Sequence, residues 1–246
     1  MSKIVAIGDI HGRAIWRKIV DENPDADKFI FLGDYFDSHE KKYHPARQIF
    51  NFKEILKLQK ELGEDRVILL LGNHDFHYYD YREKYSGYNQ VTYFNAHELL
   101  VDALKSGKMK ILHIEDGVLY SHAGVSKWWF EELCNVDTLE EINGPEFDTR
   151  LLAWNCHVGY SEEGDTISNS PIWIRPNALS KSKLEGYKQV VGHTVVWAEK
   201  FDEFMKLGNE EGIYVNDLLP NYYIVVTDGI VEYRKIMFRE EIDLEK

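Results

Sequence analysis

The sequence predicts an α/β fold in which a sheet that begins parallel is joined by a second, mixed or antiparallel sheet. Apolar strand-like runs alternate with helical patterns over the first 71 residues, as in sheets built from strand–helix–strand units. Later in the chain, Asp-Gly turns at residues 116–117 and 228–229 lie between apolar runs, a pattern typical of β-hairpins. The 246 residues are 44% hydrophobic, which suffices for a substantial core.

The first part of the chain predicts three strands separated by two helices. Strands are expected over residues 3–8, 28–32 and 67–71, which are short apolar runs followed by polar turns. Residues 13–20 have apolar side chains at helical spacing, and a long helix is expected between Pro45 and Gly63. Ligands in α/β folds lie at the carboxyl ends of such strands, so the polar turns are candidate site residues.

The second half of the chain has a different pattern. The expected elements are a helix over residues 96–105 and two hairpins, one joining 108–113 to 118–122 and the other joining 223–226 to 230–236. Residues 126–188 are loop-rich and hold several tryptophans. We interpret that stretch as a cap or insertion over the site, and we expect one domain over residues 1–246.

Charge and composition exclude several classes of function. The net charge of −13 disfavours duplex nucleic acid as a partner, because Lys and Arg contacts to phosphate dominate that affinity. A small phosphorylated substrate stays compatible, since bound cations reverse the charge locally. No apolar run reaches the length of about 18 residues that a membrane helix needs, and the N-terminus lacks a signal-peptide pattern. Cys134 and Cys156 lack metal-type spacing, so we expect free thiols and a cytoplasmic protein.

Polar residues gather at the turns that follow the predicted strands. They are Asp9 and His11, Asp34 and Asp37, Asn73 and His74, His122, and His193. One Asp in a Gly-Asp turn often only hydrogen-bonds its own backbone, and one His is often structural, but five such turns in one chain indicate a shared site. Carboxylate, amide and imidazole groups together suit Mn, Fe or Zn and match an all-oxygen calcium site poorly.

The order of these turns resembles that of a known family. The blocks read Gly-Asp-x-His-Gly, Gly-Asp-x-x-Asp, Gly-Asn-His-Asp, Ser-His-Ala-Gly and Gly-His-Thr, and they span residues 8 to 194. The chain resembles the calcineurin-like metallophosphoesterases, and within them the branch of phosphoprotein phosphatases and symmetrical diadenosine tetraphosphatases. The resemblance implies a four-layer α/β/β/α sandwich of two mixed sheets flanked by helices, in agreement with the early alternation and the later hairpins.

The resemblance also implies two divalent metal ions, about 3.5–4 Å apart. Manganese is the first expectation, with iron or zinc as the alternatives. Six residues would hold them: Asp9 and His11 the first ion, Asp34 both ions, and Asn73, His122 and His193 the second.

Family resemblance further implies a mechanism. A hydroxide between the two ions would attack phosphorus in line, without a covalent enzyme intermediate. His74 would act as the general acid that protonates the leaving oxygen. Asp37 would pair with His74, fix its tautomer and raise its proton affinity; the alternative role for Asp37 is a turn or helix cap.

The sequence departs from the branch pattern at the substrate-binding arginine. Phosphatases of this branch continue Gly-Asp-x-x-Asp with Arg-Gly, whereas Ser38 and His39 follow here, so a bidentate phosphate clamp is missing at that point. Arg175 resembles the second phosphate-binding arginine of the family, and Asn73 is implied as a further substrate contact. His39 is an alternative donor. Two rivals, Arg13 and Arg150, are expected to be surface or structural residues.

Three functions stay open at this point. The first is hydrolysis of a phosphomonoester, including a phosphoprotein; the second is cleavage of a dinucleoside polyphosphate or of another phosphoanhydride or diester; the third is a catalytically silent metal-binding scaffold. The substrate is thus a phosphorylated small molecule, a nucleotide or a phosphoprotein, and the oligomeric state is undetermined. A nuclease is disfavoured because Val195 replaces the last His of a Gly-His-x-His block. The remaining histidines are expected to be structural: His44, His77, His97, His113 and His157.

Overall fold

The computed structural model describes residues 2–82, 84–154 and 165–237. Its strands are β1 (Lys3–Ile7), β2 (Lys28–Phe31), β3 (Val67–Leu70), β4 (Met109–Lys110), β5 (Leu112–Glu115), β6 (Val118–Ser121), β7 (Lys188–Val195), β8 (Ile213–Asp217), β9 (Tyr222–Thr227) and β10 (Ile230–Lys235). Its α-helices are α1 (Ile15–Glu22), α2 (Pro45–Leu62), α3 (Asn73–Tyr79), α4 (Gln90–Lys105), α5 (Lys127–Glu132), α6 (Pro176–Lys181) and α7 (Phe201–Glu211), and short 3₁₀ helices span Glu140–Asn143, Thr149–Leu152 and Ala198–Lys200.

These strands form two mixed sheets. The six-stranded sheet has the order β10-β9-β1-β2-β3-β4, and the four-stranded sheet has the order β5-β6-β7-β8. The first sheet is parallel from β1 to β4 and antiparallel between β1, β9 and β10. In the second sheet β6, β7 and β8 are parallel, and β5 pairs antiparallel with β6. The prediction of two mixed sheets is therefore confirmed.

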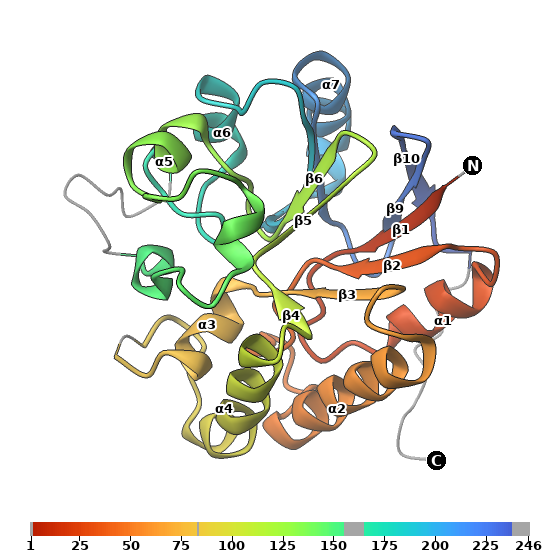
Figure 1. Ribbon diagram of the computed structural model, residues 1–246. Coiled ribbons are helices and arrows are strands. Elements are labelled where there is room, and N and C mark those ends of the chain that lie inside the picture. The colour runs from red at the N-terminus through yellow and green to blue at the C-terminus, as the bar shows by residue number, and fades with distance from the viewer. Residues whose placement is uncertain (1, 83, 155–164, 238–246) are drawn as a thin grey trace.

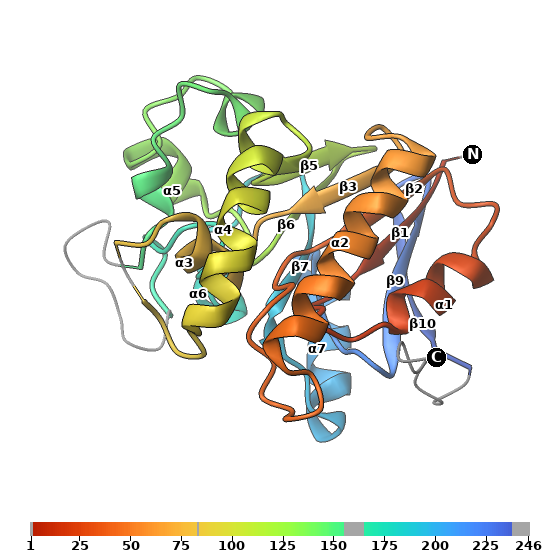
Figure 2. The same cartoon turned by 90° about the horizontal axis from the view of Figure 1, so that it is seen from below.

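Side chains alternate between the two faces along each strand, so the six-stranded sheet has a buried hydrophobic core on each face. Ile4 and Ala6 of β1 belong to a buried cluster that includes Val118 of β6 and Val190 of β7, so this face packs on the other sheet. The intervening Val5 and Ile7 belong to a second cluster, shared with apolar side chains of α1, α2 and α4. Figure 2 shows these three helices over the outer face of the sheet.

The outer face of the four-stranded sheet is covered in the same way. Val191 of β7 and Val215 of β8 form a buried cluster with Leu179 of α6, and Phe204 and Leu207 of α7 pack against it. The molecule thus has the order helices, sheet, sheet, helices, as Figure 1 shows. The predicted four-layer α/β/β/α sandwich is confirmed.

Several elements differ from the sequence-based expectation. The predicted strand 108–113 is divided, because the side chain of Asn143 accepts hydrogen bonds from the backbone N–H groups of Ile111 and Leu112. Its first part, β4, joins the six-stranded sheet, and its second part, β5, forms the expected hairpin. The late hairpin of β9 and β10 joins the first sheet instead of the second, since β9 pairs with β1. Helix α3, directly after β3, was not expected.

The parallel strands of both sheets end at one edge of the sandwich, which is where the polar turns lie. The single domain with a cap at 126–188 stays a prediction, and residues 155–164 of that segment, with Cys156 and His157, lie outside the described residues. Among the described helices, none is both long and apolar enough to cross a membrane.

Candidate functional site

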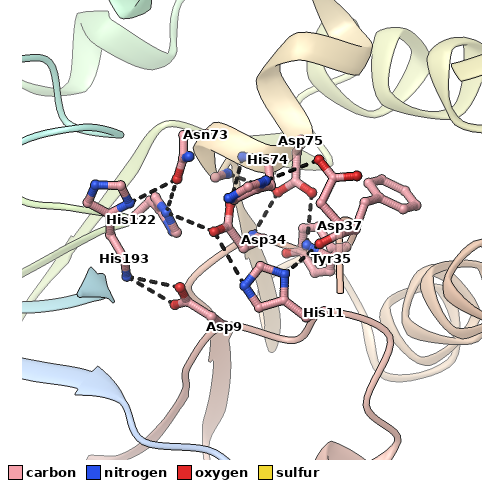
Figure 3. A network of polar contacts seen from close by, with 12 residues as sticks. Asp9, His11, Asp34, Tyr35, Asp37, Asn73, His74, Asp75, His122 and His193 are labelled. Atoms are coloured by element: carbon pink, nitrogen blue, oxygen red, sulfur yellow. Dashed lines mark hydrogen bonds and ion pairs between the residues drawn. The ribbon is translucent and has the colours of Figure 1, made fainter. Parts of the chain in front are cut away.

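The polar turns bring the predicted site residues together from both sheets. Asp9, Asp34 and Asn73 follow β1, β2 and β3, whereas His122 follows β6 and His193 lies within β7. Figure 3 shows Asp34 in the middle, with the His122 and His193 side chains on one side and the His74–Asp37 pair on the other.

Four residues of the site hold left-handed backbone conformations. The φ angles of His11, Asp34, Asp37 and His193 are 43°, 52°, 60° and 63°. Such conformations cost a non-glycine residue about 1 kcal/mol or more and persist only where the surroundings impose them. Their concentration at the strand ends indicates that the fold holds these side chains in place for a purpose other than packing.

Asp34 is shared by two groups of possible metal ligands. Among the described residues, its carboxylate forms one group with His122 and His193 and another with Asp9 and His11, each with ligand atoms within 4.8 Å of one another. Asp34 Oδ2 lies 3.4 Å from His122 Nε2 and 3.8 Å from His11 Nε2. A carboxylate between two ligand groups can bridge two cations.

Asn73 joins the two histidines of the second sheet. Its Oδ1 lies 2.9 Å from His122 Nε2 and 2.9 Å from His193 Nδ1. The backbone N–H of His193 lies 3.1 Å from each carboxylate oxygen of Asp9, and it donates to that carboxylate. All six predicted ligands therefore lie in one continuous network.

Backbone carbonyls determine which nitrogen of each histidine faces the network. His11 Nδ1 lies 2.5 Å from the carbonyl oxygen of Phe36, His122 Nδ1 lies 2.8 Å from that of Leu32, and His193 Nε2 lies 3.1 Å from that of Trp173. Each of these nitrogens must donate a proton, because a carbonyl only accepts. In a neutral imidazole the opposite nitrogen then has a free lone pair.

Those lone pairs point at oxygen atoms, which are also electron-rich. The arrangement is repulsive without a proton or a cation between the atoms, and it fits a divalent cation well. Borderline metals such as Mn, Fe and Zn accept this mixture of imidazole, carboxylate and amide ligands. The chemistry of the donor set thus fits the two divalent ions.

Electrostatics in the network are extreme because its members are buried. Burial alone would raise the pKa of Asp34, but attraction to His122 and His74 outweighs this effect and holds the pKa well below its usual range. Burial and repulsion from Asp217 raise the pKa of Asp9. For His122, attraction to Asp34 outweighs the effect of burial and raises the pKa to about 10. Burial lowers the pKa of His11 to about 4.

His74 and Asp37 form the expected pair. His74 Nδ1 lies 3.0 Å from Asp37 Oδ2, and the backbone N–H of His74 donates to Asp34 Oδ1 at 2.9 Å. Burial alone would lower the pKa of His74, but attraction to Asp34 and the bond to Asp37 outweigh it and raise the pKa to about 9. Without metal ions, the protonated form of His74 is thus favoured, and its ring can donate a proton from the edge that faces away from Asp37.

Asp75 is a site residue that the sequence reasoning missed. Its carboxylate accepts hydrogen bonds from the backbone N–H groups of Asp34, Tyr35 and Gly72, at 2.8, 2.8 and 2.9 Å. These bonds tie the turn after β2 to the turn after β3. Its sequence position could have indicated this role, because an acidic residue three positions after a helix N-cap is the spacing of a capping box.

A cavity of about 910 Å³ opens beside the network. Three residues considered for phosphate binding line it: Arg13, His39 and Arg175. Arg175 Nη1 donates to the carbonyl oxygen of His193 at 2.8 Å, which holds the guanidinium at the rim of the ligand network. Arg13, expected to be a surface or structural residue, also lines the cavity, and its Nη1 lies 3.4 Å from the carbonyl oxygen of Asp9.

Aromatic side chains form part of the cavity wall. They are Tyr85, Trp154, Trp173 and Trp197. The Trp173 ring packs edge to face against both Tyr85 and Trp154, with ring centroids 4.7 Å apart in each case. The Trp197 side chain is 63% exposed, so this wall offers an accessible planar surface to a ligand.

Other residues considered at the sequence level have ordinary surroundings, with one exception. Arg150 is paired with Asp148, and His113 with Glu115. The exception is His77, expected to be structural, whose Nε2 lies 2.6 Å from Asp37 Oδ2.

Comparison with known proteins identifies the family of the chain. A family model described as calcineurin-like phosphoesterase matches residues 2–244. Similar solved structures include a protein serine/threonine phosphatase from Saccharomyces cerevisiae (14% identity, TM-score 0.48, 98% of this chain and 82% of that chain) and a metallophosphoesterase from Sphaerobacter thermophilus (15% identity, TM-score 0.48, 96% and 89%). A search of curated proteins found no match.

Proposed function

The chain belongs to the calcineurin-like phosphoesterase family, and from this premise we propose that it hydrolyses phosphate monoesters with two divalent cations, manganese in the first place. Membership of the family makes the chain a metal-dependent phosphoester hydrolase. Our proposal concerns the class of ester, the identity of the metal and the role of each residue.

One observation carries the proposal. The two ligand groups share Asp34, and the backbone N–H of His74 donates to that same carboxylate. A proton donor therefore lies directly beside the place where two cations would be held. This combination is what hydrolysis of a phosphate ester requires, because one side of phosphorus needs an activated water and the other needs a stabilised leaving oxygen.

The six ligands divide between the two ions as their contacts suggest. Asp9 and His11 would hold the first ion, Asp34 both ions, and Asn73, His122 and His193 the second. Bound divalent cations supply Lewis acidity, which lowers the pKa of water and neutralises the charge that develops on phosphate.

The remaining residues bind the substrate and move its proton. His74 would give a proton to the leaving oxygen from the ring nitrogen opposite Asp37. Asp37 would hold the His74 ring with its Nε2–H directed toward the cavity. The cavity position of Arg175 suits a planar cation that binds phosphate oxygens, and Asn73 would add an amide contact.

A second candidate function is hydrolysis of a dinucleoside polyphosphate or of a nucleotide phosphodiester. The aromatic wall of Trp154, Trp173 and Trp197 favours it, because bases stack on such surfaces. The 910 Å³ of the cavity also exceeds what a single phosphate group needs.

A substrate panel tests the proposal. Hydrolysis of 4-nitrophenyl phosphate, bis(4-nitrophenyl) phosphate, a phosphoserine peptide and a dinucleoside tetraphosphate would be measured with manganese and with a chelator. We expect manganese-dependent turnover of the monoesters. Preference for the dinucleotide would replace our proposal with the second candidate, and turnover of none of the four by the metal-loaded protein would contradict both.

A further inference from the structure

The carboxylate of Asp37 is enclosed by more partners than a pair with His74 requires. Its Oδ2 lies 3.0 Å from His74 Nδ1 and 2.6 Å from His77 Nε2. Its Oδ1 accepts a hydrogen bond from the hydroxyl of Tyr78. The side chains of His77 and Asp37 are 0% and 1% exposed, so this carboxylate is shielded from bulk solvent.

The tautomer of His77 follows from its other nitrogen. The backbone N–H of Tyr85 donates to His77 Nδ1 at 3.2 Å. Because an N–H can only donate, His77 Nδ1 must be unprotonated. A neutral His77 then has its proton on Nε2, the nitrogen that lies 2.6 Å from Asp37 Oδ2.

The segment after α3 packs closely enough to make this contact rigid. The Tyr85 ring stacks on the His77 ring at a centroid distance of 5.9 Å and an interplanar angle of 15°. Gly87 lies against Asp37, since a Cβ built on Gly87 would be 2.8 Å from Asp37 Cβ. Asp37 is thus held between its own turn, α3 and residues 85–87.

A third metal site is the competing interpretation, because Asp37, His74 and His77 also have ligand atoms within 4.8 Å of one another. A cation bound to His77 Nε2 would require the proton to be on Nδ1. That position faces the Tyr85 N–H donor, so the proton cannot be accommodated there. The hydrogen-bond pattern therefore favours a proton, not a cation, between His77 and Asp37.

We propose that His77 is a positioning residue: its Nε2 lies against Asp37 Oδ2 and holds that carboxylate in the orientation that directs His74 at the leaving oxygen. The inference rests on the proposed role of His74 as proton donor. It adds a histidine that acts through Asp37 and does not touch the substrate. A carboxylate that is bonded to His74 and the Tyr78 hydroxyl and lies against His77 Nε2 is hindered from rotating away from His74.

If the His77 contact is removed, the loss of hydrolysis rate should depend on the leaving group of the substrate. A nitrophenolate leaves without needing a proton, whereas an alkoxide needs one in the transition state. Removing the His77 contact should therefore slow hydrolysis of an alkyl phosphate much more than hydrolysis of 4-nitrophenyl phosphate. We expect kcat for the alkyl ester to fall by roughly 10- to 100-fold, the range for groups that orient a functional residue, with KM little changed.

The experiment compares His77→Phe, His77→Gln and the control His97→Phe. His97 is a second histidine near Tyr78, and its Nδ1 lies 2.8 Å from the Tyr78 carbonyl oxygen, but it does not contact Asp37. A Gln at position 77 keeps an N–H donor near the position of Nε2, so it should restore most of the alkyl phosphate rate. His97→Phe should leave the ratio of the two rates unchanged. Each protein is assayed with manganese on 4-nitrophenyl phosphate and on phosphoserine.

Several results would overturn the inference. Equal losses on the two substrates would indicate a structural role, because a lowered folded fraction reduces both rates alike. A third bound metal equivalent that disappears in His77→Phe would establish the competing interpretation. A further loss when His77→Phe is added to His74→Asn would show that His77 does not act through His74.

A measurement independent of turnover separates this inference from the proposed function. If the wild-type protein hydrolyses neither substrate, the proposed function is contradicted and turnover cannot test the His77 contact. Nitrogen-15 NMR of the His77 ring then still decides the contact: an Nε2–H tautomer supports it, and an Nδ1–H tautomer overturns it.

Discussion

Asp34 is the side chain on which the rest of the site depends. It contacts His11 and His122, its Oδ1 accepts the His74 N–H, and its own N–H is held by Asp75. Asp suits this position better than Glu, because the residue must also adopt a φ of 52°. Asp tolerates such a left-handed conformation better than Glu or a β-branched residue.

Asp34→Asn should remove metal and activity together. The amide keeps the shape of the side chain but loses the negative charge that two cations would share. We therefore expect the rate of manganese-dependent hydrolysis to fall by at least about 100-fold, which is more than the loss expected when a residue that only supports a metal ligand is changed. Metal content after gel filtration measures the cause. Asp25→Asn, at an exposed carboxylate paired with Lys3, is the control. Full metal content in Asp34→Asn would contradict the bridging role.

Arg175→Ala should mainly weaken substrate binding. Loss of charge-assisted hydrogen bonds to phosphate should raise KM by roughly 10- to 100-fold, with a smaller effect on kcat. Steady-state kinetics on 4-nitrophenyl phosphate measure both constants. Arg150→Ala, at an exposed arginine paired with Asp148, should change neither. An unchanged KM in Arg175→Ala would exclude Arg175 as a phosphate ligand.

Among the elements, the turn from β3 into α3 aligns the site most directly. Asp75 in the first turn of α3 bonds the N–H groups of Asp34 and Gly72, so helix and strand end are fixed relative to β2. The two backbones approach so closely that a Cβ on Gly72 would lie 2.2 Å from Asp34 Oδ1 and 2.3 Å from Asp34 N. Only a residue without a side chain fits there.

Gly72→Ala should therefore disturb the site through the backbone. We expect destabilisation of about 1–3 kcal/mol from the overpacked turn, together with weaker metal binding, because the added methyl displaces Asp34. Urea denaturation with chelator and metal titration measure the two effects. Gly107→Ala is the control for metal binding, since no atom lies within 4 Å of its added Cβ; its left-handed φ of 79° should cost about 1 kcal/mol or more of stability, but it should bind metal normally. Normal metal affinity in Gly72→Ala would show that the turn does not position Asp34.

At the scale of the whole molecule, the site lies across both sheets. His122 and His193 come from the four-stranded sheet, and Asp9, Asp34 and Asn73 come from the six-stranded sheet. Bound cations would therefore connect the two halves of the sandwich. Without them, the buried charges must be balanced by protons, and stability then depends on pH.

The metal-free protein should lose stability as pH rises from 6.5 to about 10. The folded protein raises the pKa of His74 to about 9 and of His122 to about 10, above the ordinary value of 6.5. A group whose pKa is higher in the folded state contributes stability that is complete below pH 6.5 and is lost as pH rises through the folded pKa.

Urea denaturation in chelator across this pH range measures the free energy of unfolding. Saturating manganese should reverse the trend, because a cation takes the place of the protons and binds better as they leave. If the free energy of unfolding of the chelated protein stays constant or rises with pH, then protons on His74 and His122 do not balance the buried charges.

The sequence by itself determined the α/β class, three strands predicted at residues 3–8, 28–32 and 67–71 that the structure has at 3–7, 28–31 and 67–70, and the polar turns after them. These features are local: strands show in apolar runs, and strand ends show in Gly, Asp and His. It also determined which residue types meet, because the carboxyl ends of parallel strands share one edge of a sheet.

The tertiary structure alone decided which partners those residues take. Asp75 binds a turn 41 positions earlier, and His77 reaches Asp37 only because α3 and the turn after β2 lie side by side. The late hairpin pairs with β1 from the opposite end of the chain. Such contacts depend on how strands and helices pack, which no local pattern encodes, so the positioning of the site became visible only in the folded molecule.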